Sequence, residues 1–390
     1  MEDQLKVGTV LESQLGMKYT VNKMLGAGGQ GEVYDVSTED GHMALKWYYK
    51  NTATTQQKKI LENLVEKGSP DDSFLWPQDL IYTVEGEPFG YVMPLRPKEC
   101  RSIVDLMKRK AEPTFYSLCK AAYNLTRGYQ MLHKAGYSYR DISFGNVFFN
   151  PDTGDVLICD NDNVAPNGGK HGGVYGTPRF MAPEIVVGKA KPSRNTDLFY
   201  LAVLLFYMFM LNHPLEGKLE AQIKCMDILA MNKLYGTDPV FIFDPKDKRN
   251  RPLRGYQDNA LIYWDLYPKE LKDLFTKSFT FELGEPAKRV TEKKWLETFA
   301  NMMSCVMVCS NCGAETFYDA TKEHFGAVHT CWGCDNTLKV PSKIVIDKNV
   351  VLITEKANLY SHHINNDFDM NTIVGEVVVN PKNSALWGIR

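Results

Sequence analysis

The sequence predicts an α+β chain with a strand-rich N-terminal part, a mainly helical central part and a small, cysteine-containing β-rich end. Residues 18–50 alternate apolar and polar positions on both sides of a glycine-rich stretch, a pattern typical of antiparallel strands. From about residue 101 the pattern is mostly helical and continues to the segment EKKWLETFANMM. Near residue 305 paired cysteines appear, followed by β-like runs such as KIVIDKNVVLITE.

These changes of pattern divide the chain into five segments. A helix, TQQKKILENLVEKG, interrupts the N-terminal strands, and its glycine is a stop signal. The expected segments are an N-terminal extension (1–17), an N-terminal lobe of antiparallel sheet plus helix (18–95), a mainly helical C-terminal lobe (96–303), a cysteine-rich segment (304–340) and a small β-rich tail (341–390).

Composition restricts the class of protein. The net charge of the 390-residue chain is −2, which argues against nucleic acid as a partner because nucleic acids attract basic surfaces. The acidic start of the chain is not typical of a secretory signal. The longest apolar run, residues 198–211, is shorter than the roughly 20 residues that span a bilayer, so we interpret it as a buried helix. We therefore expect a cytoplasmic protein that does not bind a membrane.

The stretch GAGGQGEV is the first that indicates chemistry. Its glycines, Gly26, Gly28 and Gly31, are followed by a strand, whereas a dinucleotide-binding fold would have a helix there. A glycine loop between antiparallel strands lets backbone amides approach phosphate groups. Lys46 lies on the next strand, from which its ammonium can reach the α- and β-phosphates of a nucleotide. Without the glycines, this lysine would be interpreted as a solvated edge charge.

Two carboxylates and a carboxamide follow at a spacing that suits Mg²⁺-nucleotide chemistry. Asp141 and Asn146 share a loop after a helix, and Asp160 ends the apolar strand VLICD. In phosphoryl transfer one carboxylate orients the acceptor hydroxyl and accepts its proton, while the other two groups hold the metal. The segment GTPRFMAPE, residues 176–184, comes next.

These four motifs, in this order, make residues 18 to about 300 resemble a eukaryotic-type Ser/Thr protein kinase. The resemblance implies a bilobal protein-kinase fold, ATP and Mg²⁺ as cofactors, and protein substrates. It implies Asp141 as the catalytic base, with Asn146 and Asp160 as the Mg²⁺ ligands. The residues that it places around ATP are Leu25, Gly26, Gly28, Gly31, Val33, Ala44, Lys46 and the hinge from Met93 to Leu95.

The resemblance also implies structural anchors. Asp197 would begin the buried helix and anchor the catalytic loop, and Glu184 would pair with Arg289. Thr177, in the GTP stretch, would contact the catalytic aspartate, and residues 213–217, HPLEG, match a loop of the helical lobe.

A helix carboxylate is expected to pair with Lys46. We assign this role to Glu62. Glu66 is the alternative, because the GSPDDS stretch after the helix allows either residue to align with the family position.

The chain departs from the family pattern at three places. Tyr139 replaces a histidine, which is compatible with a packing role. Asn161 and Asp162 replace Phe-Gly after the metal aspartate, where a hydrophobic side chain normally continues the core. Ser143 replaces a lysine, and one positioned charge is worth roughly 3 to 4 kcal/mol in the transition state. We therefore expect an active but slow kinase.

Two alternatives to a protein kinase stay open. A pseudokinase scaffold that binds nucleotide without transfer is favoured by Asn161 and Ser143. A small-molecule phosphotransferase would also use an Asp-to-Asn loop, but GTPRFMAPE is typical of enzymes that dock a polypeptide.

The paired cysteines match a zinc ribbon. Cys309, Cys312, Cys331 and Cys334 form two C-x-x-C units, a pattern typical of one tetrahedral, structural Zn²⁺ site in a reducing compartment. His324 and His329 lie between the pairs and are interpreted as ordinary polar residues, and Cys305 as a core residue.

The segment after the ribbon loosely resembles the tails of bacterial kinases of the tellurite-resistance-associated type. Those kinases are found with a PP2C-type phosphatase and a von Willebrand A-type protein, which are the partners that the resemblance implies. It also implies a small forkhead-associated-like β unit for residues 341–390.

Overall fold

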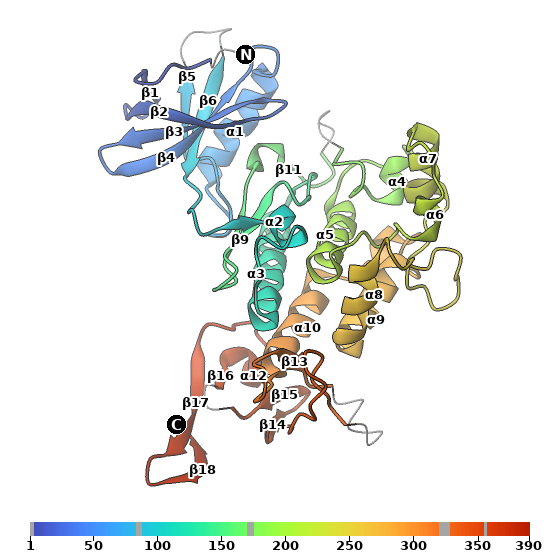
Figure 1. The fold of residues 1–390 in the computed structure, drawn as a ribbon. Coiled ribbons are helices and arrows are strands. Elements are labelled where there is room, and N and C mark those ends of the chain that lie inside the picture. Colours follow the sequence, from blue (N-terminus) through green and yellow to red (C-terminus); the bar gives the residue numbers. More distant parts are fainter. Residues whose placement is uncertain (1–3, 83–87, 170–174, 320–327, 355–356) are drawn as a thin grey trace.

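The computed structural model describes residues 4–82, 88–169, 175–319, 328–354 and 357–390. It consists of a sheet-containing N-terminal lobe, a mainly helical C-terminal lobe and an appended C-terminal unit beneath the helical lobe (Figure 1). The expected bilobal α+β fold, with a four-cysteine segment and small strands after it, is confirmed.

The N-terminal lobe is built on one six-stranded antiparallel sheet with the order β1-β2-β3-β4-β6-β5. The lobe also contains helix α1, which begins after the capping residue Thr54 and ends at Gly68. The bounds of these elements are β1 (Val10–Glu12), β2 (Lys18–Ala27), β3 (Gly31–Thr38), β4 (Gly41–Tyr48), α1 (Thr55–Lys67), β5 (Asp79–Tyr82) and β6 (Phe89–Pro94).

The two faces of this sheet have separate apolar cores. Because side chains alternate along a strand, Leu45 and Trp47 of β4 pack into one cluster, while Ala44 and Tyr48 pack into the other, beside Leu61 of α1. Lys46 lies between Ala44 and Tyr48 on the α1 face of the sheet. The sequence alternation therefore directs this lysine toward the space between the lobes.

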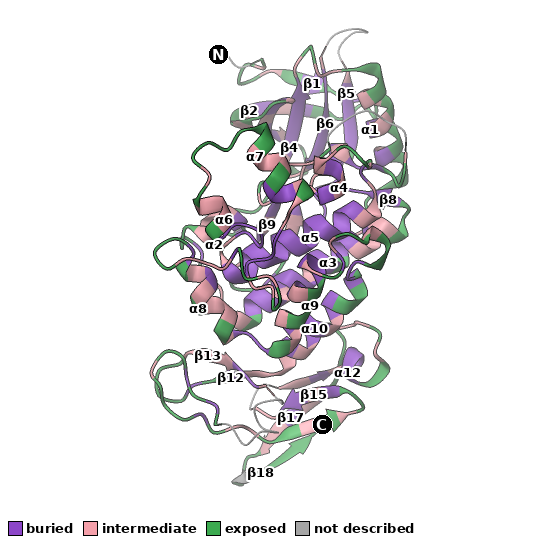
Figure 2. Ribbon diagram, turned by 90° about the vertical axis from the view of Figure 1, so that its right-hand side faces the viewer, coloured by how far each residue is buried: buried purple, intermediate pink, exposed green. Residues whose placement is uncertain are grey.

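The helical lobe surrounds α5, in which residues 196–210 are all buried (Figure 2). The apolar run of residues 198–211 is therefore a core helix, as expected. No helix in the described part of the chain is long and apolar enough to cross a membrane. The helices are α2 (Ile103–Met107), α3 (Phe115–Lys134), η1 (Asn161–Asn163), α4 (Pro183–Val186), α5 (Arg194–Met210), α6 (Lys218–Ala221), α7 (Ile228–Asn232), η2 (Lys233–Thr237), α8 (Asp258–Leu266), α9 (Lys269–Phe279), η3 (Pro286–Lys288) and α10 (Glu292–Ser304).

Short strands carry the loops of interest at the upper end of this lobe. Strands β10, β9 and β7 form a three-stranded sheet, and β11 pairs with β8. Their bounds are β7 (Arg101–Ser102), β8 (Tyr137–Ser138), β9 (Val147–Phe149), β10 (Val156–Ile158) and β11 (Ala165–Pro166). The loop from β8 to β9 contains Asp141, and the turn after β10 contains Asp160.

The C-terminal unit consists of short hairpins and one helix. Strands β12 and β13 pair, as do β14 and β15, and β16, β17 and β18 form a three-stranded sheet. The bounds are β12 (Val306–Val308), β13 (Glu315–Phe317), β14 (Lys343–Ile346), β15 (Asn349–Leu352), β16 (Asn358–Tyr360), α12 (Ser361–Asn365), β17 (Ile373–Asn380) and β18 (Asn383–Ile389). Leu352 of β15 belongs to the same apolar cluster as Cys309 and Cys331, so the first tail hairpin packs with the cysteine segment.

This unit packs closely against the helical lobe. Phe317 stacks on Phe115 at the start of α3, with ring centroids 5.3 Å apart. The ring of Tyr267 also contacts Phe317, with centroids 5.7 Å apart. At α10, Ser304 Oγ is 2.9 Å from His363 Nε2, and Lys348 pairs with Glu297 at 3.2 Å. Helix α10 therefore joins the kinase-like lobes to the tail.

Candidate active site

Three polar side chains converge in the loop between β8 and β9. Asn146 donates from Nδ2 to the carbonyl oxygen of Asp141 (2.9 Å) and to its Oδ2 (3.3 Å). Thr177 donates to Asp141 Oδ1 at 2.9 Å, which is the contact expected from the sequence. Both carboxylate oxygens of Asp141 are thus oriented by neutral donors.

A second carboxylate, that of the fully buried Asp197 of α5, binds the backbone of this loop. Asp197 Oδ2 accepts from the backbone N of Tyr139 (2.7 Å), and Oδ1 accepts from the backbone N of Arg140 (3.0 Å). Arg140 has φ 75°, a strained conformation for a residue with a side chain. The buried hydrogen bonds to Asp197 stabilise this backbone shape and so fix the position of Asp141.

His133 extends the same network toward α10. Its Nε2 lies 3.0 Å from Asp197 Oδ2, and its Nδ1 lies 2.6 Å from Glu292 Oε1. Burial alone would lower the pKa of His133, but hydrogen bonds to the two carboxylates raise it to about 9. His133 is therefore a buried cation between two carboxylates at neutral pH.

Tyr139 is buried and has a polar role in addition to packing. Its ring lies edge-on to Tyr129, with centroids 5.4 Å apart. Its hydroxyl donates to the carbonyl oxygen of Cys159, the residue before Asp160. The residue that replaces histidine therefore joins the loop that contains Asp141 to the turn that contains Asp160.

The segment GTPRFMAPE is held at both ends by ion pairs. Arg179 forms two hydrogen bonds to Glu216 of the HPLEG loop, and His213 lies 2.8 Å from the Arg179 carbonyl oxygen. At its other end, both Glu184 oxygens accept from Arg289 at 2.8 Å. The Glu184–Arg289 pairing expected from the sequence is present.

The residues expected around a nucleotide line the inner side of the N-terminal lobe. Ala44 and Met93 are opposite each other in the β4–β6 pairing, and both share an apolar cluster with Val33 and Leu95. Leu25 is 45% exposed. The backbone leaves open space around Gly26 and Gly28, where an added Cβ would meet no atom within 4 Å.

Gly31 has a different role from the other loop glycines. A Cβ at this position would lie 2.1 Å from the carbonyl oxygen of Trp47, a distance that backbone atoms cannot accept. Gly31 is therefore required for the close pairing of β3 with β4, and this pairing sets the depth of the loop above Lys46.

Lys46 is buried among oxygen atoms. Its Nζ donates to Asp162 Oδ2 at 2.8 Å, to Gln30 Oε1 at 3.0 Å and to Asp160 Oδ1 at 3.3 Å. Burial disfavours the ammonium, but Asp162 and Asp160 outweigh that effect and hold the pKa of Lys46 above its usual value. These oxygen atoms thus keep the lysine charged and fix its orientation.

The expected pairing of Lys46 with Glu62 is not found and is corrected here. Glu62 is exposed and accepts a hydrogen bond from Tyr82 at 3.1 Å, and Glu66 is also exposed. In α1 the buried positions are Leu61 and Leu64, so a residue next to Leu61 points away from the site. The α1 side chain that does reach the site, four residues before Leu61, is Gln57.

Sequence reasoning treated the residues after Asp160 as losses, but both have partners. Asn161 is fully buried, and its Nδ2 donates to the carbonyl oxygens of Leu75 (2.8 Å) and Ile158 (3.0 Å). The polar side chain thus attaches the turn to backbone on both sides. The sequence signal for Asp162 was present as a second carboxylate two residues after Asp160, but it was interpreted only as a missing glycine.

Oxygen atoms suited to a magnesium ion lie on the two loops. Asp160 has a side chain that is 40% exposed, and Asn146 uses Nδ2 for its bonds to Asp141, so its Oδ1 is the atom that can bind a cation. Carboxylate and carboxamide oxygens are the ligands that Mg²⁺ prefers. This donor set fits the ion that the sequence predicts.

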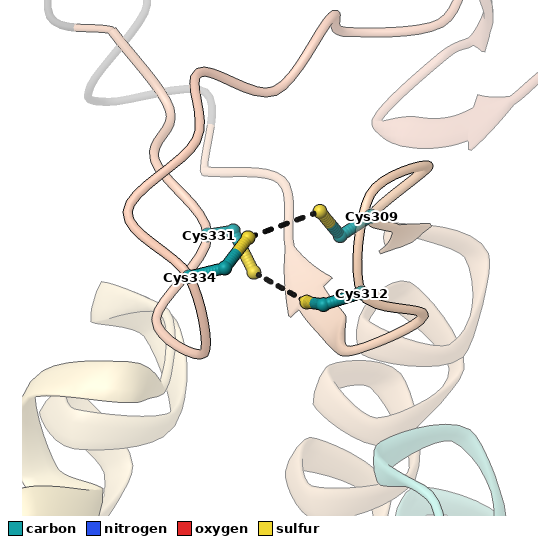
Figure 3. A group of neighbouring side chains, drawn as sticks. All are labelled: Cys309, Cys312, Cys331 and Cys334. Atoms are coloured by element: carbon teal, nitrogen blue, oxygen red, sulfur yellow. Dashed lines mark hydrogen bonds between the residues drawn. The ribbon is translucent and has the colours of Figure 1, made fainter.

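A separate candidate metal site lies in the C-terminal unit (Figure 3). The Sγ atoms of Cys309, Cys312, Cys331 and Cys334 all lie within 4.8 Å of one another. The closest pairs across the two loops are Cys309–Cys334 at 3.7 Å and Cys312–Cys331 at 3.5 Å. Tetrahedral zinc with bonds of about 2.3 Å requires sulfur atoms about 3.8 Å apart, so this spacing fits the ion.

The backbone repeats the same turn at each cysteine pair. Cys309 N donates to Ala314 O and Gly313 N to Cys309 O, at 2.9 and 2.8 Å. Cys331 N donates to Asn336 O and Asp335 N to Cys331 O, each at 2.9 Å. Gly313 and Asp335 both have positive φ, 77° and 56°. Two matching turns therefore present four thiols to one point.

His329, which lies between the two pairs, does not join this group. His329 Nε2 accepts from the backbone N of Asp319 at 3.2 Å, and the ring stacks on Tyr318. His324 lies outside the described residues. Cys305 is partly buried, and its thiol points to the carbonyl oxygen of Val350.

Comparisons with known proteins agree with this geometry. The protein kinase domain family matches residues 19–299. The chain is 28% identical over 208 residues to a probable serine/threonine-protein kinase, CCRP1, of Zea mays, covering 51% of this chain and 32% of the relative. It is 24% identical over 331 residues to the protein kinase YegI of Escherichia coli strain K12, covering 79% and 48%. It is 26% identical over 219 residues to the serine/threonine-protein kinase PkaB of Streptomyces coelicolor, covering 52% and 51%. The chain spans about a third to a half of the length of these relatives.

The buried His133 predicts a pH dependence of stability. Its pKa is raised from 6.5 to about 9 on folding, so its contribution is complete below pH 6.5 and is lost as the pH rises through 9. The shift corresponds to a loss on the order of 3 kcal/mol. Urea unfolding between pH 6 and 9.5 should show this decline in the free energy of unfolding, and the decline should be much smaller in His133→Gln.

The matched control is His42→Gln. The wild-type His42 side chain is 60% exposed, so this variant should keep the decline. An equal decline in His133→Gln and wild type would contradict the assignment.

Proposed function

This chain belongs to the protein kinase family, and we propose that it transfers the γ-phosphoryl group of Mg²⁺-ATP to serine or threonine hydroxyls of proteins. One observation carries the proposal: Lys46 of β4 donates to Asp160 in the turn after β10, and Asn146 donates to Asp141 in the loop before β9, an arrangement that supports phosphoryl transfer. The intact and doubly anchored GTPRFMAPE segment supports a polypeptide acceptor.

The chain's own residues divide the reaction between them. Asp141, oriented by Thr177 and Asn146, accepts the proton of the attacking hydroxyl. Lys46 holds the α- and β-phosphates under the glycine loop. Asp160 and Asn146 would hold Mg²⁺, which neutralises charge on the phosphates when it is bound.

We propose that transfer is slow. Ser143 stands where a lysine would face the transferred phosphate, and the loop from Asp141 to Asn146 contains no other cation. Phe144 after it packs on Phe180 and Tyr207, so this part of the loop is fixed by apolar contacts. A missing charge in a preorganised site lowers the rate about a hundred- to a thousandfold.

A nucleotide-binding scaffold without transfer is the second candidate, and the missing cation at Ser143 is the observation that favours it. Against this candidate, the polar Asn161 does not disrupt the turn, because it is hydrogen-bonded to two backbone carbonyls. A small-molecule phosphotransferase is less well supported, since it needs no peptide-docking segment.

The catalytic assignment predicts that Asp141→Asn abolishes transfer while Mg²⁺-ATP still binds, because the base is lost and the phosphate ligands are kept. Labelled ATP, a mixture of general substrate proteins and phosphoamino-acid analysis measure transfer, and nucleotide-induced thermal stabilisation measures binding. Asp152→Asn, at an exposed turn, is the matched control and should match wild type.

The other possible results of this assay would identify one of the alternative functions or contradict slow transfer. Binding without transfer in wild type would show the scaffold, and ATP consumption without labelled protein would show the small-molecule enzyme. A turnover in the usual range of roughly 1 to 100 per second would contradict the proposal of slow transfer.

We also propose that the four cysteines hold one structural Zn²⁺. All four positions are occupied by thiols, which leaves no open position for a reaction at the metal. Protein purified without added metal should contain about one zinc per chain. Cys312→Ser should lose it and release the C-terminal unit to proteolysis, whereas Cys225→Ser, an exposed thiol outside the group, should keep it. A metal-free chain with a protease-resistant C-terminal unit would contradict the proposal.

The finer assignments of partner and place remain proposals. A PP2C-type phosphatase, a von Willebrand A-type protein, a forkhead-associated-like tail and a cytoplasmic location are supported only by the resemblance and the composition of the sequence. Co-purification of the tail-containing chain with such a phosphatase would test the partner proposal.

A further inference from the structure

The buried ammonium of Lys46 contacts two carboxylates, and one of them, Asp162, has no role in the proposed metal site. The Lys46 side chain is only 7% exposed, and its two carboxylate partners differ sharply in exposure. The Asp160 side chain is 40% exposed and faces the space where the metal would bind, whereas that of Asp162 is 0% exposed. When Asp160 binds a metal, Asp162 is the carboxylate left to balance Lys46.

Asp162 is held by groups that fix its carboxylate beside Lys46. The hydroxyl of Tyr48 donates to Asp162 Oδ2, the same oxygen that accepts from Lys46. Lys46 and Tyr48 are two residues apart in β4 and therefore point to the same face. One strand thus supplies both donors to one buried carboxylate.

Helix α1 contributes an amide and no charge to this arrangement. Gln57 Nε2 donates to the backbone carbonyl of Asp162 at 2.9 Å and to the Tyr48 hydroxyl at 3.3 Å. Gln57 lies in the first turn of α1, one helical turn before buried Leu61. The α1 side chain that contacts Asp162 and Tyr48 is therefore neutral, and the charge beside Lys46 comes from the η1 segment instead.

We propose that Asp162 is the positioning residue that holds Lys46 for the nucleotide phosphates, in place of a carboxylate from helix α1. This inference rests on the proposed function of the same site. Because Asp160 and Asp162 belong to one turn, the metal ligand and the lysine are set by the same segment. Helix α1 then does not have to move a charge into the site for Lys46 to be oriented.

The first test uses the nucleotide-free protein and does not depend on catalysis. Acetic anhydride labels neutral lysine amines, and peptide mass spectrometry follows Lys46 alone. Asp162→Asn replaces the charge-assisted hydrogen bond to the Lys46 amine by a weaker neutral one, so the amine should be released more often and its labelling should be about tenfold faster. Glu62→Gln should match wild type, because that carboxylate contacts Tyr82 outside the site. Equal labelling in Asp162→Asn and wild type, or faster labelling in Glu62→Gln, would overturn the proposal.

The second test measures transfer and tries to move the carboxylate back to the helix. Asp162→Asn should lower kcat/KM for ATP at least tenfold, with the folded state verified by circular dichroism. The double variant Gln57→Glu/Asp162→Gly should recover activity relative to Asp162→Gly, since its carboxylate arises from the α1 position whose side chain contacts Tyr48 and the Asp162 backbone. Higher activity in Asp162→Asn would show instead that Asp162 blocks Lys46, and no recovery in the double variant would also count against the proposal.

The two tests separate the failure of this inference from failure of the proposed function. If wild type transfers no phosphate, the proposed function fails, while the labelling of Lys46 still shows whether Asp162 holds it. If Asp162→Asn does not fold, Glu62→Gln decides: the proposal requires kcat and KM equal to those of wild type, and a tenfold loss would overturn it.

Discussion

A protein interior cannot hold an ammonium group without a carboxylate beside it, and buried Lys46 imposes this constraint on the whole site. The turn after β10 provides the carboxylates that Lys46 needs, those of Asp160 and Asp162. Between them, Asn161 is attached to backbone carbonyls on both sides, so the turn cannot rotate without breaking buried hydrogen bonds. The sheet, helix α1 and the turn after β10 are therefore joined by contacts around one buried charge.

A second buried carboxylate, Asp197, fixes the loop that contains Asp141. It accepts hydrogen bonds from the backbone N–H groups of Tyr139 and of the strained Arg140, and through His133 it is linked to Glu292 at the start of α10. The far end of α10 contacts the C-terminal unit through Ser304. Helix α10 thus links the loop that contains Asp141, at one end, to the C-terminal unit, at the other.

Much of this could be predicted from the sequence, because the order of short motifs restricts the fold more strongly than any one of them. The glycine loop, the Asp141 loop, the apolar run of α5 and the two C-x-x-C units all have local patterns that are specific. The partner of Lys46 could not be predicted in this way. The 13-residue helix α1 offers two acidic positions, Glu62 and Glu66. Packing of Leu61 and Leu64 sets the rotation of this helix, and the sequence alone does not show which way they point. Asp162 was overlooked because its partner lies 116 residues away in the chain.

The central claim is that one turn supplies both the metal ligand and the carboxylate that holds Lys46. A crystal structure of the chain with Mg²⁺ and a non-hydrolysable ATP analogue tests it most directly. The account predicts that Lys46 Nζ contacts the phosphates while remaining within hydrogen-bond distance of Asp162, with Asp160 on the metal. A structure in which Lys46 leaves Asp162 and pairs with Glu62 or Glu66 of α1 would contradict it.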